Sequence, residues 1–235
     1  MTAKKIMGRV VSKNNLAGSY WAVGINLSEM ADFLPGQFVS IKVNEEGFRR
    51  SYSIASLPKR KSLELVVDVS PMGEGSKFIS RLEIGDSVEM LGYLGKFFVD
   101  EKDLSLENQL VFVGTGSGVV PLKPMIEDLL IRRKFLGQIY LIWGMRFEKD
   151  LFWLGDLFKL TREYKNFHFD IVLSVPGEKW SGSFGHVGDV VADLSILGKQ
   201  TRVFLCGNPE MVTEMKEVFV KRGVSEEKIL YELFA

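Results

Sequence analysis

The sequence predicts an all-β domain followed by an α/β domain within a chain of 235 residues. Short β-rich segments separated by turn residues fill the first hundred residues, and no long helix interrupts them. After Asp103 apolar strands alternate with amphipathic helices, which is typical of βαβ units and a mostly parallel sheet. Hydrophobic residues make up 46% of the chain and charged residues 26%, so there is enough apolar side chain for folded domains.

The first domain is expected to contain six strands, and their short, even spacing favours an antiparallel barrel or sandwich. The strands are Ile6–Lys13, Ser19–Asn26, Phe38–Val43, Arg50–Ala55, Leu63–Val69 and Ser87–Leu91. Turn residues separate them, at Asn14-Asn15, Pro35-Gly36, Glu46-Gly47, Pro58 and Gly85-Asp86. A short helix is expected at Ser76–Leu82, with Ser76 as its N-cap.

The second domain is expected to alternate five strands with four helices. The strands are Gln109–Gly114, Gln138–Trp143, Phe167–Val175, Thr201–Cys206 and Ile229–Phe234. The helices are about Pro121–Phe135, Asp150–Tyr164, Gly188–Leu194 and Pro209–Arg222. The charged, weakly periodic segment Asp100–Asn108 places the boundary, which gives domains 1–104 and 105–235. Ligands of such sheets bind at the carboxyl ends of the strands.

Charge and cysteine usage exclude several classes of protein. The 30 basic residues balance the 30 acidic ones, and neither half is polarised, so no nucleic-acid partner is expected. One cysteine, Cys206, excludes an intrachain disulfide and any thiolate-held cluster within this chain. With only two histidines, no metal centre is expected. No targeting segment or membrane span is seen, so a cytoplasmic protein is expected.

The segment RRSYSIAS, from Arg49 to Ser56, is the first motif. Strand alternation puts Arg50 and Tyr52 on one face. An arginine can hold a phosphate with two hydrogen bonds, and a tyrosine ring can stack on a planar heterocycle. An edge strand with a solvated arginine is the alternative interpretation.

Two glycine-rich segments follow. In PMGEGSKF, Gly73, Gly75 and Ser76 precede a helical turn, whose backbone N–H groups favour an anion. An ordinary turn and N-cap is the alternative there. In VFVGTGSGVVPLKPMI, a strand leads into Gly114, Gly116 and Gly118 and then a helix, which is the context of a dinucleotide-binding loop.

The last motifs close the second domain. FLCGNPEMV ends a strand at Cys206 and Gly207 and begins a helix at Pro209, so Cys206 lies at the carboxyl edge of the sheet. The chain finishes in YELFA, with Glu232 and Phe234 on a terminal strand. An inert buried cysteine and a plain edge strand are the alternatives.

The order of these motifs resembles the ferredoxin–NADP reductase superfamily of flavoprotein reductases, over nearly the whole chain. Arg50, Tyr52, Ser53 and Ser56 match its R-x-Y-S-x-x-S flavin motif, and Gly73 with Ser76 matches G-x-x-S. LGYLGKF resembles its G-P-x-G-x-F segment, with Tyr93 where proline is usual. GTGSGVVP at 114–121 resembles its G-T-G-x-x-P loop, with Gly118 as an extra glycine, and GMRFEKDL at 144–151 resembles G-x-R-x-x-x-D-L. The other matches are C-G-x-P at 206–209 and E-x-F at 232–234.

The resemblance implies a six-stranded antiparallel flavin-binding β-barrel before a parallel-sheet NAD(P)-binding α/β domain. It implies catalytic roles for Ser53, Cys206 and Glu232. Arg50 would bind the flavin diphosphate, Tyr52 would stack on the ring, and Cys206 and Glu232 would flank the nicotinamide. The cofactor-binding residues it suggests are Arg50, Tyr52, Ser53, Ser56, Val67, Gly73, Gly75, Ser76, Gly114, Thr115, Gly116, Pro121, Arg146, Cys206, Gly207, Pro209 and Phe234.

The expected activity is electron transfer between NAD(P)H and a one-electron acceptor of the ferredoxin or flavodoxin type, through bound FAD. FAD is expected rather than FMN because the second motif offers a diphosphate site. Val175 follows Ser174 where NADPH-preferring relatives carry arginine, which favours NADH. Reduction of free flavin or a ferric chelate, a subunit of a larger redox complex, and a non-catalytic nucleotide-binding regulatory module are the alternatives.

Overall fold

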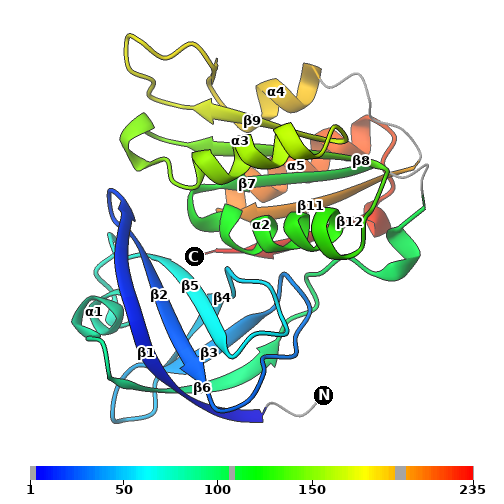
Figure 1. The fold of residues 1–235 in the computed structure, drawn as a ribbon. Coiled ribbons are helices and arrows are strands. Elements are labelled where there is room, and N and C mark those ends of the chain that lie inside the picture. The colour runs from blue at the N-terminus through cyan, green and yellow to red at the C-terminus, as the bar shows by residue number, and fades with distance from the viewer. Residues whose placement is uncertain (1–3, 106–108, 194–199, 235) are drawn as a thin grey trace. The chain divides into compact units, whose positions relative to one another are not determined.

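The computed structural model describes residues 4–105, 109–193 and 200–234, and the chain divides into two compact units (Figure 1). The first unit comprises Met1–Phe98 with Lys123–Met125, and the second comprises Val99–Leu122 with Ile126–Ala235. Within the described residues, no helix has both the length and the apolar character that crossing a membrane requires.

Six antiparallel strands form the sheet of the first unit, in the order β4-β3-β6-β1-β2-β5. They are β1 (Lys4–Ala17), β2 (Tyr20–Leu27), β3 (Phe38–Lys42), β4 (Arg49–Ser53), β5 (Ser62–Asp68) and β6 (Ser87–Leu94). A bridge between Ile54 and Leu65 joins the two ends of this order, so the sheet closes on itself. The predicted six-stranded antiparallel domain is therefore confirmed.

Strand alternation fills the interior of the closed sheet with apolar side chains. On β5, Leu63, Leu65 and Val67 are buried in the core of the unit, whereas Glu64 between them is half-buried on the opposite face. One short helix, α1 (Glu74–Arg81), follows β5. Its residue Ile79 is completely buried in the same core, which fixes the helix against the sheet.

Two local predictions for this unit are wrong. Asn14-Asn15 is not a turn, because β1 continues to Ala17 through two register irregularities in its pairing with β2. The turn falls at Gly18, which has φ 50°, and the Asn15 side chain donates to the Gly18 carbonyl at 3.0 Å. Ser76 is not an N-cap, because α1 begins at Glu74 with Gly73 before it.

The second unit contains a six-stranded sheet in the order β10-β9-β8-β7-β11-β12, with parallel pairing throughout. Its strands are β7 (Gln109–Thr115), β8 (Gln138–Met145), β9 (Phe167–Leu173), β10 (Ser183–Phe184), β11 (Thr201–Gly207) and β12 (Ile229–Leu233). Its helices are α2 (Val119–Glu127), α3 (Leu154–Glu163), α4 (Val187–Asp193) and α5 (Pro209–Lys221). The predicted parallel α/β domain is confirmed.

Shorter helical turns complete the element order. They are η1 (Glu101–Asp103), η2 (Gly116–Gly118), η3 (Asp128–Arg132), η4 (Glu148–Asp150) and η5 (Glu226–Lys228). The predicted helix 121–135 therefore corresponds to α2, which begins two residues earlier, followed by the π-helical turn η3. Strand β10 was not predicted, because two residues carry no periodicity. Leu194, the predicted end of α4, lies outside the described residues.

Helices cover both faces of the parallel sheet, α2 and α3 on one and α4 and α5 on the other (Figure 1). Beneath α4 and α5, Val113, Ile142 and Leu205 from the central strands pack against Val191 and Met215. On the opposite face Phe112 and Phe204 stack with ring centroids 4.9 Å apart. The central strands are thus apolar on both faces, and polar chemistry is confined to their ends.

Candidate functional site

In the first unit the motif residues Arg50 and Tyr52 of β4 lie against the first turn of α1. A Cβ placed on Gly75 would collide with the Tyr52 hydroxyl and would come within 3.0 Å of Arg50 Cγ. Only glycine allows this approach, so the sequence places an arginine and a tyrosine directly beside a helix N-terminus. Two motifs that are more than twenty residues apart form one cluster.

The electrostatics of this cluster favour an anion. Arg50 is exposed, its guanidinium lies 3.8 Å from the Phe48 ring centroid, and it donates to the Arg49 carbonyl at 3.0 Å. Among the described residues no carboxylate forms an ion pair with Arg50. The first N–H groups of α1, including that of Gly75, have no intrahelical acceptor. Gly73, which precedes the helix, supplies no side-chain cap to accept from them. This donor set fits a diphosphate.

The hydroxyl groups near β4 differ in their surroundings. Burial raises the pKa of Tyr52 to about 12, so this phenol stays neutral, and its ring packs partly against the core. Ser53 is buried at the end of β4. Ser56 accepts a hydrogen bond from the Glu64 backbone N–H at 3.1 Å, which ties the end of β4 to β5.

Val67 lies in the interior of the first unit, where only 6% of it is exposed. Its side chain points into the core from β5, on the same face as Leu63 and Leu65. In the structure its contribution is to the packing that holds β5 in place.

In the second unit β7 runs into the glycine turn η2 and then α2, in the order that the sequence predicts. Gly116 has φ 56°, which favours glycine. Gly118, the glycine that is extra to the family pattern, packs against β11: a Cβ there would collide with the Cys206 carbonyl. Gly118 therefore lets the turn rest directly on the end of a neighbouring strand.

Thr115 occupies a gap between two glycines at the carboxyl ends of the strands. A Cβ on Gly207, which has φ 153°, would collide with Thr115 Oγ1, and a Cβ on Gly144 would lie 3.0 Å from Thr115 Cγ2. Gly207 is the last residue of β11 and Gly144 the last but one of β8, and these strands lie on either side of β7. The end of the sheet here is a surface made largely of backbone.

Trp143 was missed by the sequence reasoning. It is completely buried on β8, and its indole N–H donates to the Gly116 carbonyl at 3.1 Å. This bond holds the glycine turn from the neighbouring strand. The sequence signal that could have indicated this residue is its position directly before the segment 144–151, which resembles the family pattern.

Cys206 and Glu232 are register partners on β11 and β12, and Gly114 flanks Cys206 on the other side. Cys206 is completely buried. Burial raises the pKa of its thiol well above the ordinary value, and the Glu232 carboxylate raises it further. Burial raises the pKa of Glu232 to about 7. Within the described residues, Glu232 Oε2 is buried without a hydrogen-bond partner.

Two of the other candidates hold the backbone around this edge. Pro209 is the first residue of α5, and the Asn208 side chain before it accepts from the Met211 N–H at 2.7 Å. The Phe234 N–H donates to the Gly207 carbonyl at 2.8 Å, which secures the chain beyond β12.

Pro121 and Arg146 lie in contrasting environments. Pro121 is buried in the first turn of α2. Arg146 follows β8 and is exposed, with its guanidinium 5.0 Å from the Phe147 ring centroid. Its carbonyl accepts from the Val175 N–H at 2.9 Å, which ties together the loops that follow β8 and β9.

Comparison with known families identifies both units. Residues 8–99 match the model of the oxidoreductase FAD-binding domain, and residues 112–217 match that of the oxidoreductase NAD-binding domain. Together the two matches define a chain that consists of an FAD-binding and an NAD-binding oxidoreductase domain. The chain belongs to the ferredoxin–NADP reductase superfamily.

Three curated relatives are similar over most of this chain. Protein RfbI of Salmonella typhimurium is 31% identical over 86% of this chain and 59% of its own length. A component of the Na(+)-translocating NADH-quinone reductase of Neisseria gonorrhoeae is 30% identical over 84% and 51%. The toluate 1,2-dioxygenase electron transfer component of Pseudomonas putida is 27% identical over 97% and 65%. This chain thus spans about half to two thirds of these relatives.

Solved structures share the fold. The cytochrome P450 reductase GcoB of Amycolatopsis superposes with a TM-score of 0.91 at 29% identity, over 99% of this chain and 70% of that one. Ferredoxin-NADP+ reductase of Plasmodium falciparum superposes with a TM-score of 0.83 at 19% identity, over 98% and 96%. The second likeness concerns the fold alone.

Proposed function

We propose that this chain takes electrons from NAD(P)H and passes them, through bound FAD, to a one-electron acceptor outside these 235 residues. Residues 1–104 would bind FAD and residues 105–235 would bind NAD(P)H. The observation that carries the proposal is Glu232: a buried carboxyl oxygen without a partner among the described residues lies beside Cys206 at the carboxyl edge of the sheet. Ligands of parallel sheets bind at this edge, and buried polar atoms are otherwise satisfied.

In the first unit, Arg50 would hold the diphosphate of FAD together with the N–H groups of Gly75 and Ser76. When bound, FAD supplies a ring that accepts a hydride and can release electrons singly. Tyr52 and Ser53 would contact that ring, and the neutral Tyr52 phenol would add no charge there. Gly73 would leave the N-terminus of α1 accessible to the phosphates, because it has no side chain to cover the N–H groups. Ser56 and Val67 would act by holding β4 and β5 in register.

In the second unit, Gly114, Thr115, Gly116 and Pro121 would shape the dinucleotide pocket, with Gly207, Pro209 and Phe234 holding its far side. Cys206 would present a neutral thiol, because its pKa is raised. Glu232 would hold or release a proton at its carboxyl group near neutral pH. Positioning of the nicotinamide by these two side chains would supply most of the catalysis.

The preference between the two reductants is proposed to be for NADH. Residues 174–177 carry no arginine, and the guanidinium of the exposed Arg146 lies over Phe147. The measurement is the ratio of kcat/KM for NADH and NADPH, and a strong preference for NADPH would contradict the proposal. Arg146→Ala and Lys179→Ala variants test the two remaining cations, since each should lower any NADPH activity more than the NADH activity.

The proposed acceptor is a separate electron carrier of the ferredoxin or flavodoxin type. The chain has one cysteine, which is buried in β11, so these residues hold no thiolate-ligated cluster of their own. The names of two relatives describe an electron transfer component and a part of a quinone reductase. Electrons would therefore leave the flavin for a group elsewhere.

A basic docking patch could form from Arg49, Lys59, Arg60, Lys61 and Lys77, and a merely solvated face is the alternative interpretation of these charges. Two of its members carry ion pairs, Arg49 with Glu89 and Lys59 with Asp32 at 2.6 Å. Arg60, Lys61 and Lys77 are exposed. These three residues are the better candidates for steering an acidic partner.

The test begins with the purified protein under anaerobic conditions. FAD should be released on denaturation, and NADH should bleach its absorbance. A colourless protein that takes up no flavin would instead support a regulatory nucleotide-binding module. Cytochrome c reduction that requires added ferredoxin or flavodoxin supports the carrier, whereas fast turnover with free flavin or a ferric chelate alone contradicts it.

A further inference from the structure

Strand β9 leaves one edge of the parallel sheet open. It is the last long strand of the sheet, because β10 pairs only with Val172 and Leu173. In the described part of the chain, no strand pairs with residues 167–171 on the side away from β8. An open strand edge is a template for another strand.

The backbone groups on this edge can be assigned from its neighbours. The Asn166 carbonyl accepts from Ile139 of β8, and the Ser174 N–H donates to the Met145 carbonyl of β8. The Leu173 carbonyl accepts from Gly185 on the opposite side. Because strand residues alternate, residues 168, 170 and 172 face β8, and 167, 169 and 171 face outward. The outward groups are the Phe167 carbonyl, both groups of Phe169 and the Ile171 N–H.

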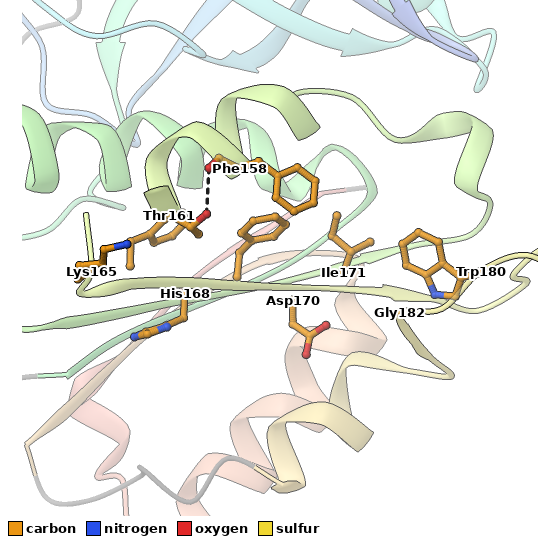
Figure 2. A pocket seen from close by; sticks show the side chains of 10 residues that line it. Phe158, Thr161, Lys165, His168, Asp170, Ile171, Trp180 and Gly182 are labelled. Atoms are coloured by element: carbon orange, nitrogen blue, oxygen red, sulfur yellow. Dashed lines mark hydrogen bonds between the residues drawn. The ribbon is translucent and has the colours of Figure 1, made fainter. Parts of the chain in front are cut away.

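A groove of about 520 Å³ runs along this edge. Side chains from both faces of β9 line it, so it follows the strand edge rather than one face. His168 and Asp170 project to one side, while Phe158 and Thr161 of α3 lie on the other (Figure 2). Phe158 is 55% exposed, and its ring packs edge-on to Phe169 at 5.1 Å. The groove therefore offers an apolar wall beside a strand edge.

Within one copy His168 Nε2 lies 3.0 Å from Gln138 Oε1, and the Ser183 hydroxyl donates to Asp170 Oδ1 at 3.0 Å, so His168 Nδ1 and Asp170 Oδ2 are the atoms that can meet a second copy of this strand. Its sequence is Phe167-His168-Phe169-Asp170-Ile171. If two copies run antiparallel about a two-fold axis at Phe169, each His168 lies opposite the Asp170 of the other copy. We propose that this chain forms a symmetric dimer by antiparallel pairing of β9 with β9 of a second copy.

The backbone fits the same register. A two-fold axis at Phe169 makes it a hydrogen-bonded pair, in which each Phe169 N–H meets the carbonyl of the other copy. At the next pair the Ile171 N–H meets the Phe167 carbonyl of the other copy, and this pair has one bond rather than two because the Phe167 N–H donates to the Tyr164 carbonyl of its own chain at 3.1 Å. His168 and Asp170 then form a non-hydrogen-bonded pair, whose side chains are closer.

The ends of the groove agree with the pairing. Lys165 and Trp180 line opposite ends of it (Figure 2). An antiparallel copy therefore brings its Lys165 toward Trp180, where an ammonium group and an indole ring attract each other. Such a self-complementary patch is the hallmark of a two-fold interface.

The test is sedimentation equilibrium of the FAD-loaded full chain over a wide range of concentration. The wild type should dimerise. His168→Asp places two aspartates opposite each other twice, and should raise the dimer dissociation constant at least about tenfold. The double variant H168D/D170H exchanges the two side chains, so that each aspartate again lies opposite a histidine, and should restore dimerisation. His186→Asp makes the same change at an exposed histidine outside β9 and should have no effect.

A monomeric wild type at every concentration would overturn the proposal, as would a dimer that H168D leaves intact. The register has its own test in F169C. Paired Phe169 Cα atoms would be about 5.5 Å apart, which a disulfide can span, and the native Cys206 is buried. Mild oxidation should link F169C but not F184C, whose position on β10 is off the axis. A dimer that F169C cannot link would refute this register.

Discussion

Cys206 and Glu232 face each other across β11 and β12, and each lies in surroundings that disfavour its charged form. Burial acts on both groups, and the carboxylate adds repulsion against a thiolate. A neutral thiol therefore sits beside a carboxyl group that titrates near neutral pH. Such an arrangement costs stability when Glu232 is charged, which gives it a measurable pH dependence.

Replacement of Glu232 by glutamine should remove that dependence. The pKa of Glu232 is raised from 4.5 to about 7 in the folded chain, so the folded state binds the proton more tightly than the unfolded state. The wild-type free energy of unfolding should fall as pH rises from about 4.5 to about 7 and should lose no more from this group above it. At pH 8, E232Q should be more stable by about 1–3 kcal/mol, after discounting for residual solvent contact.

Urea unfolding at pH 5 and pH 8 measures this effect. Glu226→Gln is the matched control, because Glu226 is exposed on η5 and its removal should leave the pH dependence of the wild type intact. Equal pH dependence in E232Q and the wild type would show that the carboxyl is not buried as described.

Cys206 should resist alkylation in the folded protein. The thiolate is the reactive form, and the thiol is fully buried with a pKa well above its ordinary value. Iodoacetamide at pH 8 should label it only when urea unfolds the chain, as followed by mass spectrometry. Rapid labelling of the native protein would contradict the burial.

Replacing Arg50 should affect mainly the binding of FAD, whereas replacing Arg49 should affect mainly the stability of the fold. Arg50→Ala removes the cation beside the N-terminus of α1 and should weaken FAD binding about 10–100-fold, with little change in the melting temperature of the flavin-free protein. Arg49→Ala removes an ion pair with Glu89 and a bond to the Ser40 carbonyl at 2.9 Å. It should cost about 1 kcal/mol of stability and leave FAD affinity nearly unchanged.

Flavin fluorescence titration and thermal unfolding of both variants decide this comparison. Arg50→Lys keeps the charge without the two-pronged hydrogen bonding and should bind FAD with intermediate affinity. If R50A binds FAD as tightly as the wild type, Arg50 is only a solvated surface residue.

Two glycine substitutions should shift stability in opposite directions. Gly118→Ala would drive a methyl group into the Cys206 carbonyl and should cost about 1–3 kcal/mol. Gly155 lies in α3 with open space around its Cα, so Gly155→Ala should add about 0.5–1 kcal/mol. Thermal unfolding of the two variants checks both signs.

Features that extend over a whole domain could be predicted from the sequence, whereas features that depend on a few residues could not. The two domains followed from periodicity, because a closed antiparallel sheet and a parallel sheet impose different spacing of apolar residues. The prediction of a turn at Asn14-Asn15 was wrong because both residues pair with β2. Asparagine favours a turn only where no neighbouring strand pairs with its backbone. The N-cap at Ser76 was wrong because Gly73 lets α1 begin earlier.

Site residues that belong to a sequence motif could be predicted. Contacts that depend on the packing of distant residues could not. Arg50, Tyr52 and Gly75 were named from two separate motifs, but only the structure shows that Gly75 is glycine because Tyr52 and Arg50 press against it. The bond from Trp143 to Gly116 joins β8 to the glycine turn that follows β7, and it leaves no local pattern in the sequence. Residue roles toward FAD and the nicotinamide stay predictions until the variants are measured.

The backbone surface around Thr115 has a consequence for how this protein can evolve. Gly207 cannot gain a side chain without displacing Thr115, Gly144 cannot gain one without displacing Val187, and Gly118 cannot gain one without displacing β11. Mutation therefore has almost no freedom at the end of the sheet. The exposed loops that follow β8 and β9, with Arg146 and residues 174–177, carry no such constraint. Under the proposed function, a lineage that exchanges one nicotinamide cofactor for the other would do so in those loops, and the glycine surface around Thr115 would stay unchanged.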